Sequence, residues 1–122
     1  MKLHEHVEAR MNLVMRHDEG QIQINGQAHT APCIVAPGFL CTDWIPDLES
    51  LTAGSLAALW PLEPRVILLG TATRQHGSIR ELRPMLAARQ IALEVMDLGA
   101  ACRTYNVLAQ EDRPVAALLF PR

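Results

Sequence analysis

The stretch DLGAACRTYN, which begins at Asp97, holds the side chains of this chain that are best suited to chemistry. Cys102 would lie near the amino end of a helix, where the helix dipole can lower the pKa of the thiol and favour the nucleophilic thiolate. A catalytic cysteine also needs a general base, and His76 on a neighbouring loop is the candidate. No spacing rule joins Cys102 to His76, so a partly buried structural cysteine is the alternative interpretation.

The polar neighbours of Cys102 point to binding. Arg103 could present its guanidinium to a carboxylate or a phosphate, pair with an acidic neighbour, or be exposed without a chemical role. Successive helical residues turn by ~100°, so Arg103, Thr104 and Asn106 are not all expected to face the core. Asp97 could cap the same helix or sit favourably against its dipole. We predict a ligand or partner surface that includes these four polar residues.

A second polar turn, GTATRQHG over 70–77, follows an apolar segment. It lacks the Lys-Ser/Thr pair of a phosphate loop, and it does not open a helix as G-x-G-x-x-G. It is therefore either a connector or a turn that accommodates an anion or a neighbouring side chain. We add Gly70 and Thr71 to the predicted surface.

Three short apolar segments, 65–70, 91–97 and 114–120, alternate with stretches of helical character and predict a β-α-β-α-β unit. Strands with so little polar alternation are covered on both faces, which is typical of a parallel sheet. The carboxyl ends of parallel strands meet at one edge of the sheet. Thr71 and Asp97 should therefore be neighbours at that edge.

A proline decides where the first connecting helix should begin. Ser78 and Glu81 have capping-box spacing, but a helix that began there would hold Pro84 in its interior at a cost of ~3 kcal/mol. That cost is avoided if Pro84 lies in the first turn. We therefore predict a helix from about Arg83 and a long loop over 71–82.

Two other helices are bounded by their sequence signals. Thr52 is the expected N-cap of a helix that buries Leu56 and Leu59 and ends before Pro61. The last helix is predicted over 99–110. Its apolar stripe comprises Ala101, Tyr105 and Leu108, with Cys102 and Ala109 beside it.

Residues 12–36 predict an antiparallel β meander. The alternation in QIQING places Ile22 and Ile24 on one face, and Asn25-Gly26 can take the positive φ values of a tight hairpin. The segment PCIVAP, bounded by prolines, is the expected third strand.

These elements predict a three-layer α/β fold, with an antiparallel meander joined to a mixed, largely parallel sheet. At 122 residues the chain fits a single domain over 1–122 with one core, and residues 1–10 are expected to be a flexible N-terminus. Apolar residues make up 49% of the chain and charged residues 20%, as in globular proteins.

Charge and composition exclude several classes of protein. A net charge of −2 and a single lysine, Lys2, give no clustered basic surface of the kind that binds nucleic acid, although the arginines could still form a small patch. The apolar runs are far shorter than the ~20 residues of a transmembrane helix, and MKLHEHVEAR lacks the apolar core of a signal peptide, so a cytoplasmic protein is expected. Three cysteines without a C-x-x-C pair predict free thiols. We expect neither a metal nor a cofactor.

The block EVMDLGAACRTYNVLAQEDRPVAAL over 94–118 resembles the signature of a widespread domain of unknown function, whose members include a mitochondrial factor for assembly of respiratory complex I and an adipogenesis-associated protein. G-x-I-x-I-N-G at 20–26, Trp44 and ILLGTAT at 67–73 occur in the same order. The resemblance implies a three-layer α/β fold and a role in assembling a membrane-associated complex. This chain departs from the motif at two places, with Leu98 where the motif has threonine and Thr73 where it has a second glycine.

The leading hypothesis is a non-enzymatic binding or assembly module that takes a protein client. The surface for that client would be formed by 70–76 and 97–106, and it could also accept a small anionic ligand. The first alternative is a small-ligand enzyme with Cys102 as nucleophile and His76 as base. The second is a homo-oligomeric scaffold that uses an exposed β edge.

Overall fold

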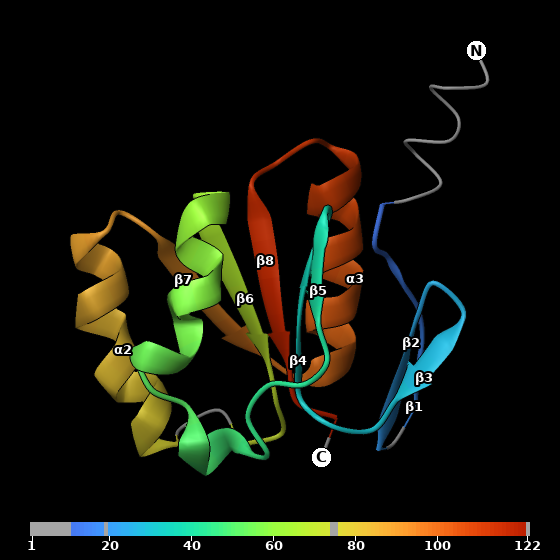
Figure 1. Ribbon diagram of the computed structural model, residues 1–122, viewed down its shortest axis with the longest axis horizontal. Helices are drawn as coiled ribbons and strands as arrows, with labels where there is room; N and C mark the ends of the chain where they lie inside the picture. Colours follow the sequence, from blue (N-terminus) through green and yellow to red (C-terminus); the bar gives the residue numbers. More distant parts are fainter. Residues whose placement is uncertain (1–10, 19, 74–75, 122) are drawn as a thin grey trace.

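The computed structural model describes residues 11–18, 20–73 and 76–121, and the N-terminal segment expected to be flexible lies outside them (Figure 1). The described part of the chain forms two sheets, two α-helices and two 3₁₀ helices. In chain order the elements are β1 (Val14–Asp18), β2 (Gln21–Ile24), β3 (Gln27–His29), β4 (Cys33–Ala36), β5 (Phe39–Cys41), η1 (Leu48–Ser50), η2 (Gly54–Leu62), β6 (Val66–Gly70), α2 (Gly77–Ala88), β7 (Ala92–Met96), α3 (Leu98–Gln110) and β8 (Val115–Leu119).

The larger sheet has the strand order β5-β4-β8-β6-β7. Strands β6, β7 and β8 are parallel, and β4 is antiparallel to both β5 and β8. The prediction of a mixed, largely parallel sheet built from a β-α-β-α-β unit is therefore confirmed.

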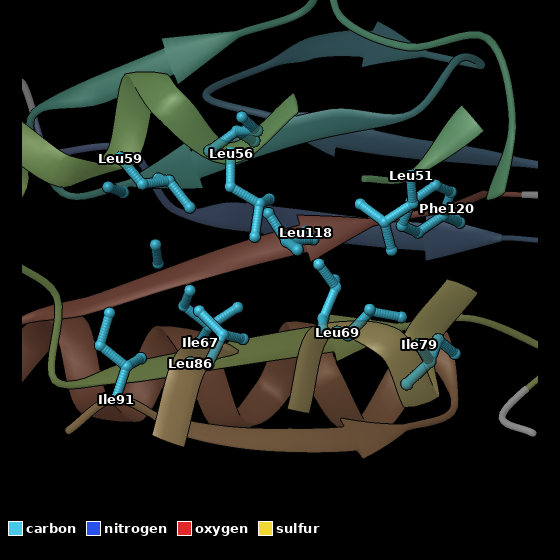
Figure 2. Packing of buried hydrophobic residues seen from close by; sticks show 14 residues of the cluster. Leu51, Leu56, Leu59, Ile67, Leu69, Ile79, Leu86, Ile91, Leu118 and Phe120 are labelled. Carbon is cyan, nitrogen blue, oxygen red and sulfur yellow. The ribbon is translucent and has the colours of Figure 1, made fainter. Parts of the chain in front are cut away.

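The large sheet is the middle of three layers, because its two faces are covered by different elements. Along β6, Ile67 and Leu69 belong to the core beneath η2 and α2, whereas Leu68 belongs to the core beneath α3. Figure 2 shows the first core, where Leu56 from η2 packs against the sheet residue Leu118. The small sheet of β1, β2 and β3 joins α3 on the opposite face (Figure 1).

The small sheet is the predicted antiparallel meander, in the order β1-β2-β3. Asn25 and Gly26 connect β2 to β3 with φ values of +52° and +88°, which suit the tight hairpin turn expected from the sequence. Ile22 and Ile24 are both buried, and they face the core beneath α3.

The third strand predicted for the meander belongs to the other sheet. β4 pairs with β5 and β8 rather than with β2 or β3. All four residues of β4 are buried, which requires cover on both faces. The two-sided larger sheet provides that cover, whereas the small sheet has one solvent-facing side.

The predicted start of the first connecting helix was also wrong. α2 begins at Gly77, so it occupies part of the expected loop, and it carries Pro84 in its interior. His76 caps the helix through Nδ1, which accepts the Ser78 N–H at 3.1 Å. The helix then buries Ile79, Leu82 and Leu86 against the first core. Burial of this apolar stripe outweighs the local cost of the proline.

Pro84→Ala is expected to raise the free energy of unfolding by about 1–2 kcal/mol. The alanine restores a helical N–H and removes a ring clash, and the gain is reduced because the unfolded chain also becomes freer. Urea denaturation measures the change. Pro46→Ala, at an exposed loop proline outside the helices, is the control and should give no gain. Equal changes in the free energy of unfolding for Pro84→Ala and Pro46→Ala would show that Pro84 does not destabilise the helix.

The helix that was expected to follow Thr52 is present, but as a 3₁₀ helix rather than an α-helix. η2 is a 3₁₀ helix that includes Pro61, where the sequence predicted an α-helix ending before that residue. Leu56 and Leu59 are fully buried at a spacing of three, which is the period of a 3₁₀ helix. The predicted N-cap is wrong by one residue, because η2 has Ala53 as its N-cap, without a side-chain capping hydrogen bond. The Thr52 Oγ1 nevertheless accepts the Ser55 N–H at 3.2 Å.

Candidate functional site

The turn after β6 and the start of α3 lie side by side at the carboxyl edge of the parallel strands. Gly70 is the register partner of Met96, and the Thr71 N–H donates to the Met96 carbonyl at 3.0 Å. Asp97 follows Met96 directly. The structure thus brings Thr71 and Asp97 together as predicted, and the connections after β6 and β7 leave toward opposite faces of the sheet.

Gly70 is a packing residue at this edge. A Cβ added to it would lie 2.6 Å from the Ala101 Cβ and 3.3 Å from the Leu98 Cα. No side chain fits between β6 and the first turns of α3, and Gly70 is itself buried. Its role is to let α3 approach the sheet, so it offers no surface of its own.

Thr71 is buried as well, and its side chain organises the turn. Its Oγ1 accepts the Thr73 N–H at 3.2 Å, and Thr71 is only 2% exposed. Ala72 and Thr73 are exposed at the tip of the turn. Arg74 and Gln75 belong to the predicted segment but lie outside the described residues.

Asp97 is the N-cap of α3. Its Oδ1 accepts the Ala100 N–H at 2.8 Å, which satisfies one of the unpaired donors of the first turn. The capping interpretation drawn from the sequence is confirmed. The residue is exposed, so the carboxylate also faces solvent at the edge of the sheet.

Arg103 and His17 lie across the first turn of α3. A Cβ on Gly99 would be 2.8 Å from His17 Cε1 and 3.2 Å from Arg103 Nη1. His17 was not among the predicted site residues, because nothing in a single sequence places β1 beside this helix. Arg103 is exposed, so its guanidinium remains accessible next to the imidazole.

Asn106 serves the fold rather than an open surface. Its Nδ2 donates to the Val14 carbonyl at 2.8 Å, and its Oδ1 accepts the Val14 N–H at 2.9 Å. The side-chain amide thus pairs with β1 as a neighbouring strand would. Thr104 is half-buried on the same helix. Of the predicted surface residues, Asp97, Arg103 and Thr104 reach solvent, whereas Gly70 and Thr71 are buried and Asn106 is engaged.

Cys102 and His76 lie in different layers of the fold. Cys102 is 2% exposed in the core beneath α3, whereas His76 caps α2 on the other side of the sheet. Burial raises the pKa of the Cys102 thiol to about 11, and the nearby Arg103 opposes this only in part. The helix dipole was expected to lower the pKa of Cys102, whereas burial raises it, because the loss of solvation outweighs the effect of the dipole.

Cys102 should therefore react slowly with iodoacetamide in the folded protein at pH 8. Cys33 is fully buried with a pKa raised to about 12, mainly by burial, and should be as slow. Cys41 is only partly buried and should be modified first, at least ~10-fold faster. Peptide mapping by mass spectrometry gives the three rates, and the urea-unfolded chain is the control in which they should converge. Rapid modification of Cys102 would support the alternative hypothesis of an enzyme with Cys102 as its nucleophile.

Two negative observations apply to residues 11–18, 20–73 and 76–121 alone. No helix there is long and apolar enough to cross a membrane. Nor do three or more His, Cys, Asp or Glu side chains there gather in a group that could hold a metal ion.

Comparison with known proteins identifies a family and several relatives of this chain. The model of a family described as "Protein of unknown function (DUF498/DUF598)" matches residues 14–120. A Danio rerio protein named NADH dehydrogenase (ubiquinone) 1 alpha subcomplex assembly factor 3 is 36% identical over 100 residues, which cover 80% of this chain and 58% of that protein. The chain spans little more than half the length of the curated relatives that carry this name.

Solved structures share this fold over most of the chain. The solution structure of a Xanthomonas campestris protein matches with a TM-score of 0.78 at 35% identity and covers 89% of this chain and 83% of that one. A Bordetella pertussis protein described as an Mth938-like domain matches with a TM-score of 0.71 at 29% identity, covering 90% of this chain and 85% of that one.

Proposed function

The chain belongs to the DUF498/DUF598 family, and from this premise we propose that it is a non-enzymatic module that holds a protein client during assembly of a membrane-associated respiratory complex. The observation that carries the proposal is the likeness to the Danio rerio assembly factor over 80% of the chain. The proposal concerns the shared domain, since that relative is much longer.

The client would bind the exposed side of α3, which we call the client surface and define as Asp97, Arg103, Thr104 and Val107. Thr104 lies seven residues after Asp97, and Val107 lies three residues after Thr104 and four after Arg103, which are spacings that place side chains along one side of a helix. Val107 is 54% exposed, and it adds an apolar side chain that a bound partner would cover. A cation, a carboxylate and an apolar side chain on one side of a helix can complement both the charge and the shape of a partner surface.

Arg103→Glu is expected to remove the client from the proteins that co-purify with this chain. The substitution reverses a charge on the client surface, and like charges across an interface are strongly unfavourable. Quantitative affinity purification of the wild type and the variant measures the loss, and we expect at least a ~10-fold decrease for the client. Arg80→Glu, at an exposed arginine of α2 on the other side of the sheet, is the matched control.

Identical partner profiles for the wild type and Arg103→Glu would count against the client surface. A loss shared by Arg103→Glu and Arg80→Glu would indicate a general effect of charge. Near-ultraviolet circular dichroism of both variants would establish that the fold is retained.

A further inference from the structure

A cavity of about 460 Å³ opens at the other end of the large sheet, where β6, β7 and β8 begin. It is separate from the client surface, which lies along α3 and reaches the carboxyl edge of the strands. Its volume is within the range of about 300–1,000 Å³ that is typical of sites for small molecules. Three apolar residues in its lining are Pro64, Ile91 and Pro114.

The frame of this cavity is held by backbone hydrogen bonds between the starts of the three strands. The Arg65 N–H donates to the Pro114 carbonyl at 2.8 Å, and the Arg65 carbonyl accepts the Ala92 N–H at 2.9 Å. On the side of η2, Glu63 takes a left-handed φ of +50° and donates its N–H to the Trp60 carbonyl at 3.1 Å. The backbone that frames the cavity is therefore held in place by these hydrogen bonds.

Two guanidinium groups contribute positive charge to the lining. The Arg89 guanidinium carbon lies 3.9 Å from the centroid of the Trp60 ring, in a cation–π contact. A guanidinium stacked in this way keeps its N–H edges available in one plane, and it is preorganised for the two oxygens of an anion. Arg65 is an exposed lining residue one position before β6.

The acidic residue of the lining does not neutralise these arginines by direct contact. Every lining residue lies in the described part of the chain, and no ion pair within 4.0 Å joins Glu63 to Arg65 or Arg89 there. The lining keeps a formal charge of +1, with charged groups next to an apolar wall. This net positive charge attracts an anion into the cavity.

We propose that this cavity binds a small organic oxyanion, meaning a carboxylate or phosphate head group on a short aliphatic body. The head group is held by Arg65 and Arg89, and the body packs against Pro64, Ile91 and Pro114. The proposal is independent of the client surface, because the two sites share no residue.

The two tryptophans of the chain provide the test. Trp60 is a lining residue of the cavity, whereas the indole N–H of Trp44 donates to the Ser55 carbonyl at 2.8 Å and serves as an internal reference. The ¹⁵N-labelled full chain is titrated with succinate and, separately, with inorganic phosphate at constant ionic strength. We expect the Trp60 indole resonance to shift in a saturable way while the Trp44 resonance stays in place. Saturation by succinate alone assigns a carboxylate, and saturation by phosphate alone assigns a phosphate.

Matched variants decide whether the arginines make the site. Arg65→Gln and Arg89→Gln should each raise the dissociation constant about tenfold or more, and Arg80→Gln, at an exposed arginine outside the cavity, should leave it unchanged. Arg65→Gln leaves the stacking on Trp60 intact, so its result holds even if Arg89→Gln perturbs folding. Absence of saturation with both anions, or equal weakening in Arg80→Gln, would overturn the proposal.

Discussion

Tyr105→Ala is expected to lower the free energy of unfolding by about 3–5 kcal/mol, the cost of deleting a buried aromatic side chain. Tyr105 is fully buried in the core beneath α3, and its hydroxyl donates to the Asn12 carbonyl at 2.7 Å. Asn12 in turn donates its side-chain Nδ2 to the Ala36 carbonyl at 3.0 Å. The alanine variant leaves a cavity and also frees the segment that precedes β1. Denaturation in urea gives the change.

Tyr105→Phe separates the hydroxyl from the ring, and it should cost only about 1 kcal/mol. Burial raises the pKa of Tyr105 above its ordinary value of 10.0, so the folded protein keeps the phenol protonated where the unfolded chain ionises it. That contribution to stability is complete below pH 10 and is lost as the pH rises further. The phenylalanine variant should lack this part of the alkaline loss. If it costs as much as the alanine variant, the ring itself contributes nothing.

Gly70→Ala is expected to lower the free energy of unfolding by about 2–3 kcal/mol, although it adds a single methyl group. That methyl group would lie 2.6 Å from the Ala101 Cβ, and the nearby Leu98 Cα is backbone that cannot move aside cheaply. α3 must therefore shift away from β6, and the contacts of its buried stripe weaken. Urea denaturation measures the loss.

Gly38→Ala is the matched control for Gly70→Ala, because a Cβ there would meet no atom within 4 Å. We expect its effect to stay within about 0.5 kcal/mol. Ala101→Gly in the Gly70→Ala background should restore part of the lost stability, since it removes the clashing methyl group. A Gly70→Ala protein as stable as the wild type would disprove the close approach.

The fold was predictable where short-range chemistry and tertiary packing agree. Asn25-Gly26 predicted the hairpin because these residues tolerate positive φ values, and Asp97 predicted the start of α3 because aspartate is a favoured N-cap. Local rules failed at Pro84, where the cost of the proline is real but burial of an apolar stripe on both sides of it is larger. They failed again at β4, whose partner β8 lies far away in the sequence.

The candidate site was predictable in its position but not in its details. Parallel strands fix the neighbourhood of Thr71 and Asp97 from topology alone. The engagement of Asn106 with Val14 and the position of His17 over Gly99 depend on how the small sheet docks on α3. No periodicity within one segment contains that information. The burial that raises the pKa of a thiol is likewise a property of the assembled core.

The placement of β8 between β4 and β6 has a consequence for the order in which the protein is built. Among the described strands β8 comes last in the sequence, yet it joins the antiparallel strands to the parallel ones. The ribosome releases β4 and β5 long before β8 has been synthesised. Until then, the edge of β4 that pairs with β8 has no strand to hydrogen-bond with. We expect folding to finish only when β8 inserts, at a rate limited by this long-range pairing. A nascent chain stalled before Val115 should therefore need protection from aggregation.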